Sequence, residues 1–275
     1  MRGLVLVEYM HRLIALIASI LIPLNAVYMW WTHRKNRLVS RLALLSMLLL
    51  ALQVALGALI VVFVLPGAFT TIDVGNSFLL LIVLASLTAA GWREHRQKLT
   101  KPSAKALQED ADKAKPFRVP VSFALGVIFF QSIVGGYFRH SGNSQALFGQ
   151  HSYLLSHHQQ TMPSETEALF WLVLHIGVTA GVVASIVWLL TLSVRNGRYR
   201  IEAFALFTLT VYQIAVGFLT LQTKLAVSSD TLHFAGANAL VGVAGYLIAQ
   251  VLLDASAVRI EAREKTQRKM IPAHS

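Results

Sequence analysis

Apolar residues in this chain gather in long runs that short polar segments separate. A run of about 20 apolar residues crosses the hydrocarbon core of a bilayer as a helix. The runs lack the period-two alternation of a barrel strand, so we expect helices. The seven predicted spans are 4–31, 42–63, 75–92, 119–138, 168–194, 203–223 and 232–253. The pattern therefore predicts an all-α membrane protein with seven transmembrane helices.

Composition agrees with this prediction and excludes several kinds of site. Of 275 residues, 55% are hydrophobic and 13% charged, against roughly 25% charged in soluble domains. The absence of cysteine excludes disulfides, thiolate-bound zinc, iron–sulfur clusters and cysteine nucleophiles. The first run contains Glu8, His11 and Arg12, and no small-residue cleavage site follows it. We therefore interpret it as a span and not as a cleavable signal peptide.

The basic residues behind the net charge of +11 are concentrated in alternate connections between the predicted spans. Of the 24 Lys and Arg residues, 20 lie in alternate connections or the tail, at 32–41, 93–118, 195–200 and 259–269. The intervening connections hold only Arg139 and Lys224. Because cytoplasmic loops carry the excess of basic residues, we expect the N-terminus outside and the C-terminus in the cytoplasm. The pattern indicates a multi-pass protein of a prokaryotic plasma membrane and disfavours a nucleic-acid partner.

A charged segment divides the chain into two parts. Residues 93–117 are rich in Lys, Ala, Glu and Asp and predict a cytoplasmic linker with room for a short helix. The predicted units are an N-terminal half at 1–92, a C-terminal half at 118–254 and a cytoplasmic tail at 255–275.

The two halves share features in the same order, 160 to 164 residues apart. The matched pairs are His11 with His175, Gln53 and Gly57 with Gln213 and Gly217, and Asp73 with His233. A near-constant offset indicates an internal duplication. The duplication is unequal, three spans against four, and the unmatched span is the first of the C-terminal half. An N-terminal half without that helix starts outside, as the charge distribution also predicts.

Seven ionisable residues lie at span ends on the predicted outer side. They are Glu8, His11, Arg12, Asp73, Arg139, His175 and His233. Such residues are costly within a membrane and indicate function by default. The other histidines of the predicted external connection, His140, His151, His157 and His158, are interpreted as solvated loop residues. The alternative is that the segment HSYLLSHHQQ binds a metal at the surface.

The two histidines of the C-terminal half form the strongest candidate site. The fifth and seventh spans both enter from outside, so His175 and His233 are expected at comparable depth. Two imidazoles from facing helices can clamp a metal or a heme iron. Alternatively, each is a hydrogen-bonded histidine in a helix interface. The matched pair and its repeat counterpart His11 favour ligation.

The first predicted span contains further candidate functional residues. Glu8 and His11 face the same side of a helix, so Glu8 is either an acid–base group or a partner that orients His11. Arg12 and Arg139 are candidates for gripping propionate carboxylates. Their alternative roles are interfacial snorkelling or an ion pair with Glu8 or Asp73.

Four segments resemble the heme A synthase family, in order and over nearly the whole chain. They are VEYMHRLIAL, LQVALGALIVVFVLP, FFQSIVGGYFRHSG and TLHFAGANALVG. The Glu-x-x-His-Arg and Gly-x-x-Arg-His-x-Gly elements are the more specific marks. The resemblance implies two pseudo-symmetric four-helix halves and oxidation of the C8 methyl group of heme O to the formyl group of heme A.

The resemblance also implies roles for named residues. His175 and His233 would ligate a resident heme b, His11 would bind the iron of the substrate heme, and Glu8 would be catalytic. The sequence departs from the family pattern in two ways: the first helix is absent, and Asp73 stands where a second N-terminal histidine is expected. Heme O and membrane lipid are the implied partners, with a heme O synthase, an electron donor and a second copy of the chain as further candidates.

We therefore expect a heme A synthase-type oxidoreductase. The alternative is a non-catalytic heme-binding or electron-transfer protein with a degenerate N-terminal site. Asp73 and the missing helix favour that alternative, and the retained Glu8-x-x-His11-Arg12 element disfavours it. A transporter is disfavoured, because the ionisable residues avoid the midplane where transporters bind their substrates.

Overall fold

All described elements of the computed structural model are helical. It describes residues 2–34, 36–149 and 162–256, with side chains from Tyr9 onwards except that of His11. The long helices are α1 (Arg2–Thr32), α2 (Arg37–Phe63), α3 (Gly67–Thr100), α5 (Arg118–His140), α8 (Glu165–Asn196), α9 (Arg200–Gln222) and α10 (Val227–Ala255). These seven are long and apolar enough to cross a membrane. The prediction of an all-helical, multi-pass membrane protein is confirmed.

Local capping chemistry sets several helix ends. Asn36 precedes α2, and its side chain accepts hydrogen bonds from the backbone N–H groups of Leu38 and Val39. Ser164 caps α8 in the same way. The turn between α8 and α9 passes through Gly197 at φ 70°, a left-handed conformation that glycine adopts without steric cost. These short connections make neighbouring helices antiparallel.

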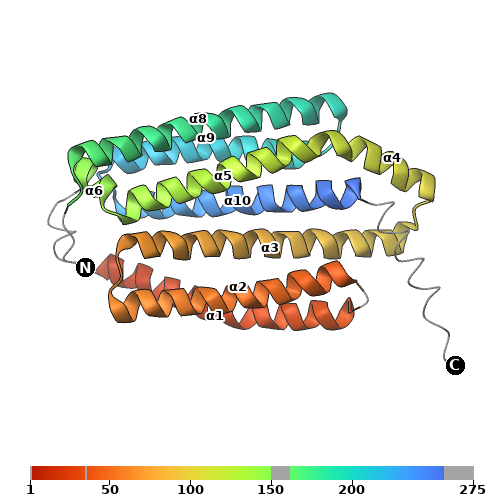
Figure 1. Ribbon diagram of the computed structural model, residues 1–275, viewed down its shortest axis with the longest axis horizontal. Helices are drawn as coiled ribbons and strands as arrows, with labels where there is room; N and C mark the ends of the chain where they lie inside the picture. The colour runs from red at the N-terminus through yellow and green to blue at the C-terminus, as the bar shows by residue number, and fades with distance from the viewer. Residues whose placement is uncertain (1, 35, 150–161, 257–275) are drawn as a thin grey trace.

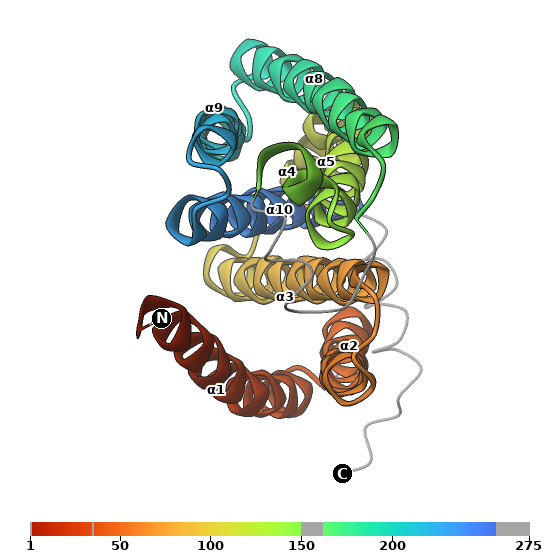
Figure 2. The same ribbon diagram turned by 90° about the vertical axis from the view of Figure 1, so that its left-hand side faces the viewer.

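The helices form two groups that meet along α3 and α10 (Figures 1 and 2). The helices α5, α8, α9 and α10 surround a common centre, and α3 packs against α10 and α5. Gly245 allows the close approach of these two helices, since a Cβ atom there would lie 3.1 Å from the Ile82 Cα. The main core cluster draws its side chains from α3, α5, α8, α9 and α10, including Phe78, Ile128 and Leu247.

The N-terminal helices bury much less of their surface. Among the described side chains, α1 buries only Ala26, and α2 buries Val39, Ala43 and Ser46. Most of the remaining large apolar side chains on these helices are exposed. Lipid can cover such faces without cost, because acyl chains are as apolar as leucine. The predicted three-plus-four duplication and the membrane orientation stay predictions.

The predicted linker packs against the helix bundle. Residues 93–100 continue α3, and α4 (Ala104–Ala114) and the 3-10 helix η1 (Lys115–Phe117) follow. Arg198 bridges Asp110 at 2.8 Å and Asp254 at 3.4 Å. The Tyr199 hydroxyl donates to Asp254 at 2.8 Å. Burial raises the pKa of the Tyr199 phenol and the nearby Asp254 carboxylate raises it further, so this phenol stays a neutral donor.

A candidate cofactor cavity between two histidines

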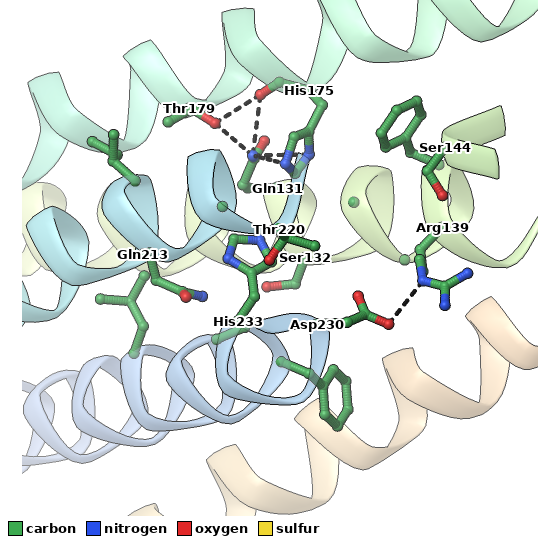
Figure 3. A pocket seen from close by; sticks show the side chains of 18 of the residues that line it. Gln131, Ser132, Arg139, Ser144, His175, Thr179, Gln213, Thr220, Asp230 and His233 are labelled. Carbon is green, nitrogen blue, oxygen red and sulfur yellow. Dashed lines mark hydrogen bonds and ion pairs between the residues drawn. The ribbon is translucent and has the colours of Figure 1, made fainter. Parts of the chain in front are cut away.

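A cavity of about 400 Å³ opens between the helices at the end of the bundle that carries α6 (Asn143–Phe148). Small-molecule and cofactor sites span about 300–1,000 Å³. His175 from α8 and His233 from α10 both line it, although they are 58 positions apart in the chain (Figure 3). The structure thus brings the predicted pair together in one cavity. Their roles as ligands stay a prediction.

Each imidazole lies against a glycine of a neighbouring helix. A Cβ atom on Gly135 of α5 would lie 2.7 Å from Cε1 of His175. A Cβ atom on Gly217 of α9 would lie 3.0 Å from Cε1 of His233. Real Cβ atoms almost never show a contact as short as 2.7 Å, so a larger residue at Gly135 would displace the ring of His175, and the 3.0 Å contact at Gly217 would require a smaller shift of the ring of His233. Two glycines on different helices therefore create the room that the histidine rings occupy.

The two rings differ in their polar contacts. The amide nitrogen of Gln131 lies 3.0 Å from Nδ1 and 3.4 Å from Nε2 of His175. By contrast, the ring of His233 has no side-chain hydrogen-bond partner within the described part of the chain, and its polar contact is with the backbone of Gln213. The two imidazoles are therefore held in different ways, one by a glutamine side chain and the other by a neighbouring backbone.

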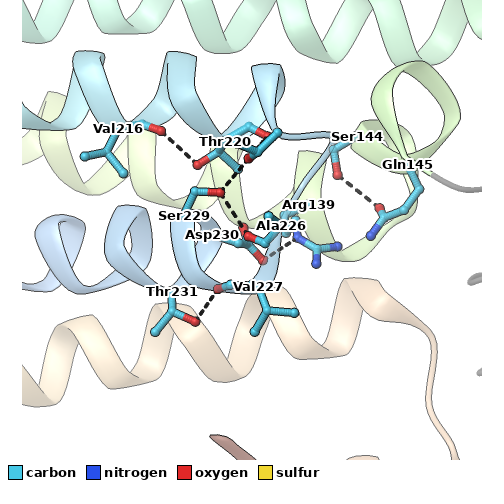
Figure 4. A network of polar contacts seen from close by, with 11 residues as sticks. Arg139, Ser144, Gln145, Val216, Thr220, Ala226, Val227, Ser229, Asp230 and Thr231 are labelled. Carbon is cyan, nitrogen blue, oxygen red and sulfur yellow. Dashed lines mark hydrogen bonds and ion pairs between the residues drawn. The ribbon is translucent and has the colours of Figure 1, made fainter. Parts of the chain in front are cut away.

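An ion pair lies in the same cavity as the histidines (Figure 3), and Figure 4 shows the polar contacts around it. Arg139 Nε donates to Asp230 Oδ2 at 2.9 Å, and both side chains are about 30% exposed. In the first turn of α10, the Ser229 hydroxyl contacts the Ala226 carbonyl at 2.9 Å and the Thr223 hydroxyl at 2.8 Å. These contacts fix the segment that carries Asp230.

The ion-pair partner of Arg139 differs from the ones that the sequence suggested. The sequence suggested Glu8 or Asp73 as partners, whereas the described partner is Asp230, 91 positions away. A signal for Asp230 was present in the sequence. It precedes His233 by three residues, the spacing that separates Glu8 from His11. Both carboxylates lie one helical turn before a candidate histidine.

His140 is the second correction. It is the last residue of α5 and lines the cavity beside Arg139, so it is not a solvated loop residue. The start of α3 packs against it, since a Cβ atom on Gly67 would lie 1.7 Å from the His140 carbonyl oxygen. The other three histidines of that connection, His151, His157 and His158, lie outside the described residues.

The predicted N-terminal site is described only in part. Asp73 Oδ1 accepts a hydrogen bond from Gln53 Nε2 at 2.7 Å, and Asn76 donates to Gln53 Oε1 at the same distance. Asp73 therefore belongs to a polar network between α2 and α3. Arg12 is an exposed residue of α1, and the side chains of Glu8 and His11 lie outside the described ones.

Comparison with known proteins places these features in a family. The family model described as cytochrome oxidase assembly protein (COX15-CtaA) matches residues 2–244. No curated protein matches the chain. The match runs from the start of α1 into α10. It therefore includes both the cavity and the N-terminal residues that the sequence singled out.

Proposed function

Because the chain belongs to the heme A synthase family of cytochrome oxidase assembly proteins, which convert heme O to heme A, we propose that the cavity between α5, α8, α9 and α10 holds a resident heme b. The chain is thus a multi-pass membrane oxidoreductase of a heme-binding family. One observation carries the proposal: His175 and His233, on separate helices, line one cavity. These two imidazoles would hold a heme iron, since histidine is a common protein ligand of heme.

The residues present fit a heme better than a bare metal ion. Among the described residues, no group of three or more His, Cys, Asp or Glu could hold a metal. A macrocycle supplies the remaining iron ligands itself. The cavity lining is mainly apolar, with Phe138 and Ile128 among its residues, as expected for a cofactor pocket. Gly135 and Gly217 leave space at both rings.

The polar residues of the cavity have proposed tasks as well. Asp230 holds Arg139 through Nε alone among the described contacts. The terminal nitrogens of the Arg139 guanidinium then remain for a propionate carboxylate, which arginine binds bidentately. Bound heme b supplies one-electron chemistry. The protein contributes two neutral imidazoles, an oriented guanidinium and a largely apolar environment.

We propose that the substrate heme O binds at the N-terminal half. His11 would contact its iron, Arg12 a propionate, and Glu8 would serve as the acid–base group. With water as the source of oxygen and an external electron acceptor, oxidation of the methyl group to a hydroxymethyl group and then to an aldehyde would release two protons and two electrons at each step, and a carboxylate one turn from His11 would be placed to accept a proton. Asp73 accepts a hydrogen bond from Gln53. This contact supports a role for Asp73 in packing beside the substrate, in place of a role as an iron ligand.

The proposed setting is a prokaryotic plasma membrane with the cavity end outside and α4 in the cytoplasm. The basic residues near α4 support this orientation. A membrane enzyme that makes heme O is the proposed source of the substrate. We also propose two further partners: a protein that exchanges electrons with this chain, and a second copy of the chain.

Extraction and chromatography of the hemes from the purified protein test this assignment. We expect heme b and a six-coordinate low-spin spectrum. His175→Ala and His233→Ala should each abolish that spectrum while the protein still inserts. His140→Ala is the matched control, because it removes a histidine from the same cavity and should leave the low-spin spectrum in place. A native spectrum in both ligand variants would refute the assignment.

Conversion is tested separately, by co-expression with a source of heme O. Heme A should accumulate with the wild-type protein and not with Glu8→Ala. Absence of heme A in the wild-type cells, with resident heme present, would show that the N-terminal half has lost catalysis.

A further inference from the structure

Three apolar residues that line the cavity also face outward from the helix bundle. Ile176 on α8 and Ile214 and Phe218 on α9 line the cavity, yet they expose 59%, 48% and 64% of their surface. Ile214 and Phe218 are four positions apart in α9 and share one face of that helix. The cavity therefore reaches the outer surface of the bundle between α8 and α9.

The other sides of the cavity are covered by neighbouring elements. At the end of the bundle, α6 packs against α8 and α5 and buries its first three residues. Toward the N-terminal helices, the ring of Phe234 lies 6.2 Å from the ring of Phe78 on α3. Figure 2 shows α8 and α9 on the side of their group that faces away from α1, α2 and α3. Among the described elements, none lies outside α8 and α9.

The opening lies at the level of the candidate ligands and not at the end of the bundle. Ile176 directly follows His175, and Phe218 directly follows Gly217, which makes room for the ring of His233. His175 is ten residues from the start of α8 at Glu165, which corresponds to about 15 Å along the helix axis. With 168–194 as the predicted span, the opening faces acyl chains and not water.

A bilayer makes such an opening inexpensive and suits it to an amphiphilic ligand. Acyl chains cover exposed apolar side chains without cost. Heme combines an apolar macrocycle with two propionate carboxylates, and Arg139, the proposed propionate partner, lies in the last turn of α5. A heme in the outer leaflet already has its carboxylates among the headgroups and its macrocycle among the acyl chains. Sideways movement into the cavity preserves that orientation, whereas entry from the end would take the macrocycle past the ion pair of Arg139 and Asp230.

We propose that the opening between α8 and α9 is a lateral portal, through which heme enters the cavity edge first from the outer leaflet of the membrane. This inference rests on the proposed resident heme. Ile176, Ile214 and Phe218 form the rim of the portal. Because these three side chains are not ligands of the iron, they control the rate of heme exchange and not the heme content at equilibrium.

The test is heme exchange in the full-length, heme-loaded protein in phosphatidylcholine vesicles. Isotopically labelled heme is added to the bilayer, and its replacement of the resident heme is followed over time. Ile176→Trp and Ile214→Trp narrow the portal and should slow exchange about 5- to 150-fold, the factor expected for overpacking. Heme content and the low-spin spectrum should not change. Phe218→Ala widens the portal and should speed exchange.

Ile201 supplies the matched control. It lies on the same helix as Ile214, is 84% exposed and does not line the cavity. Ile201→Trp therefore places the same bulky side chain against lipid without narrowing the portal. It should exchange heme at the wild-type rate.

The outcomes separate this inference from the proposed function. Exchange in Ile176→Trp and Ile214→Trp at the rate of Ile201→Trp would overturn the portal while the heme assignment stands. Faster exchange with lower heme content in these two variants would also overturn it, because the rim would then hold the heme and not gate it. If neither variant retains heme, Phe218→Ala decides: faster exchange at full heme content supports the portal, and the wild-type rate overturns it. A wild-type protein without low-spin heme would overturn both proposals.

Discussion

Replacing Gly135 by alanine should weaken heme retention, because the added methyl group meets the ring of His175. The Cβ atom would lie 2.7 Å from Cε1 and 3.1 Å from Nδ1 of that ring. A ring that is bound to iron has less freedom to turn away from the added methyl group than a ring without heme. We therefore expect the clash to cost more in the heme-bound state.

The expected magnitude follows from the cost of overpacking. Inserting one extra methyl group into a packed site costs about 1–3 kcal/mol. Since each 1.4 kcal/mol is a factor of ten in an equilibrium constant, heme affinity should fall about 5- to 150-fold. The gain in helix propensity from glycine to alanine, about 0.5–1 kcal/mol, acts equally with and without heme and does not enter this ratio.

Gly126 is the control for this experiment. It lies on the same helix, and a Cβ atom there has no neighbour within 4 Å. Gly126→Ala therefore has the same effect on helix propensity without a contact in the cavity. The assay is the rate and extent of heme transfer from purified protein to an excess of a heme-scavenging protein. Wild-type retention in Gly135→Ala, or an equal loss in both variants, would refute the argument.

Three further predictions follow from the site and the topology. Asp230→Asn should reduce heme content by no more than about five-fold, since a partly exposed ion pair contributes at most about 1 kcal/mol to holding Arg139; complete loss of heme would contradict this. Glu8→Ala should stop formation of heme A while the resident heme stays bound, and equal activity with the wild type would exclude the catalytic role. Reporter fusions after residues 100 and 150 should give cytoplasmic and external signals respectively, and a cytoplasmic signal from the second fusion would overturn the orientation.

The sequence by itself determined the number and type of the spans. In a bilayer every backbone group must be satisfied within its own helix, so length and apolar composition predict each span without knowledge of its neighbours. Six of the seven predicted runs lie wholly inside a long helix, and the run 203–223 extends one residue beyond the end of α9. The sequence also singled out His175 and His233, because an ionisable residue in an apolar run is visible locally.

The contacts between helices were decided only by the tertiary structure. Gln131 meets His175 across 44 positions, and Arg139 meets Asp230 across 91. Such pairs depend on how each helix is rotated about its axis. The spacing of Gln131 and Gly135 repeats that of Gln213 and Gly217, yet the side-chain amide of Gln131 contacts the ring of His175 whereas the side chain of Gln213 lies toward Gly236. One spacing gives two environments because packing against the neighbouring helix, and not the spacing, determines what each side chain touches.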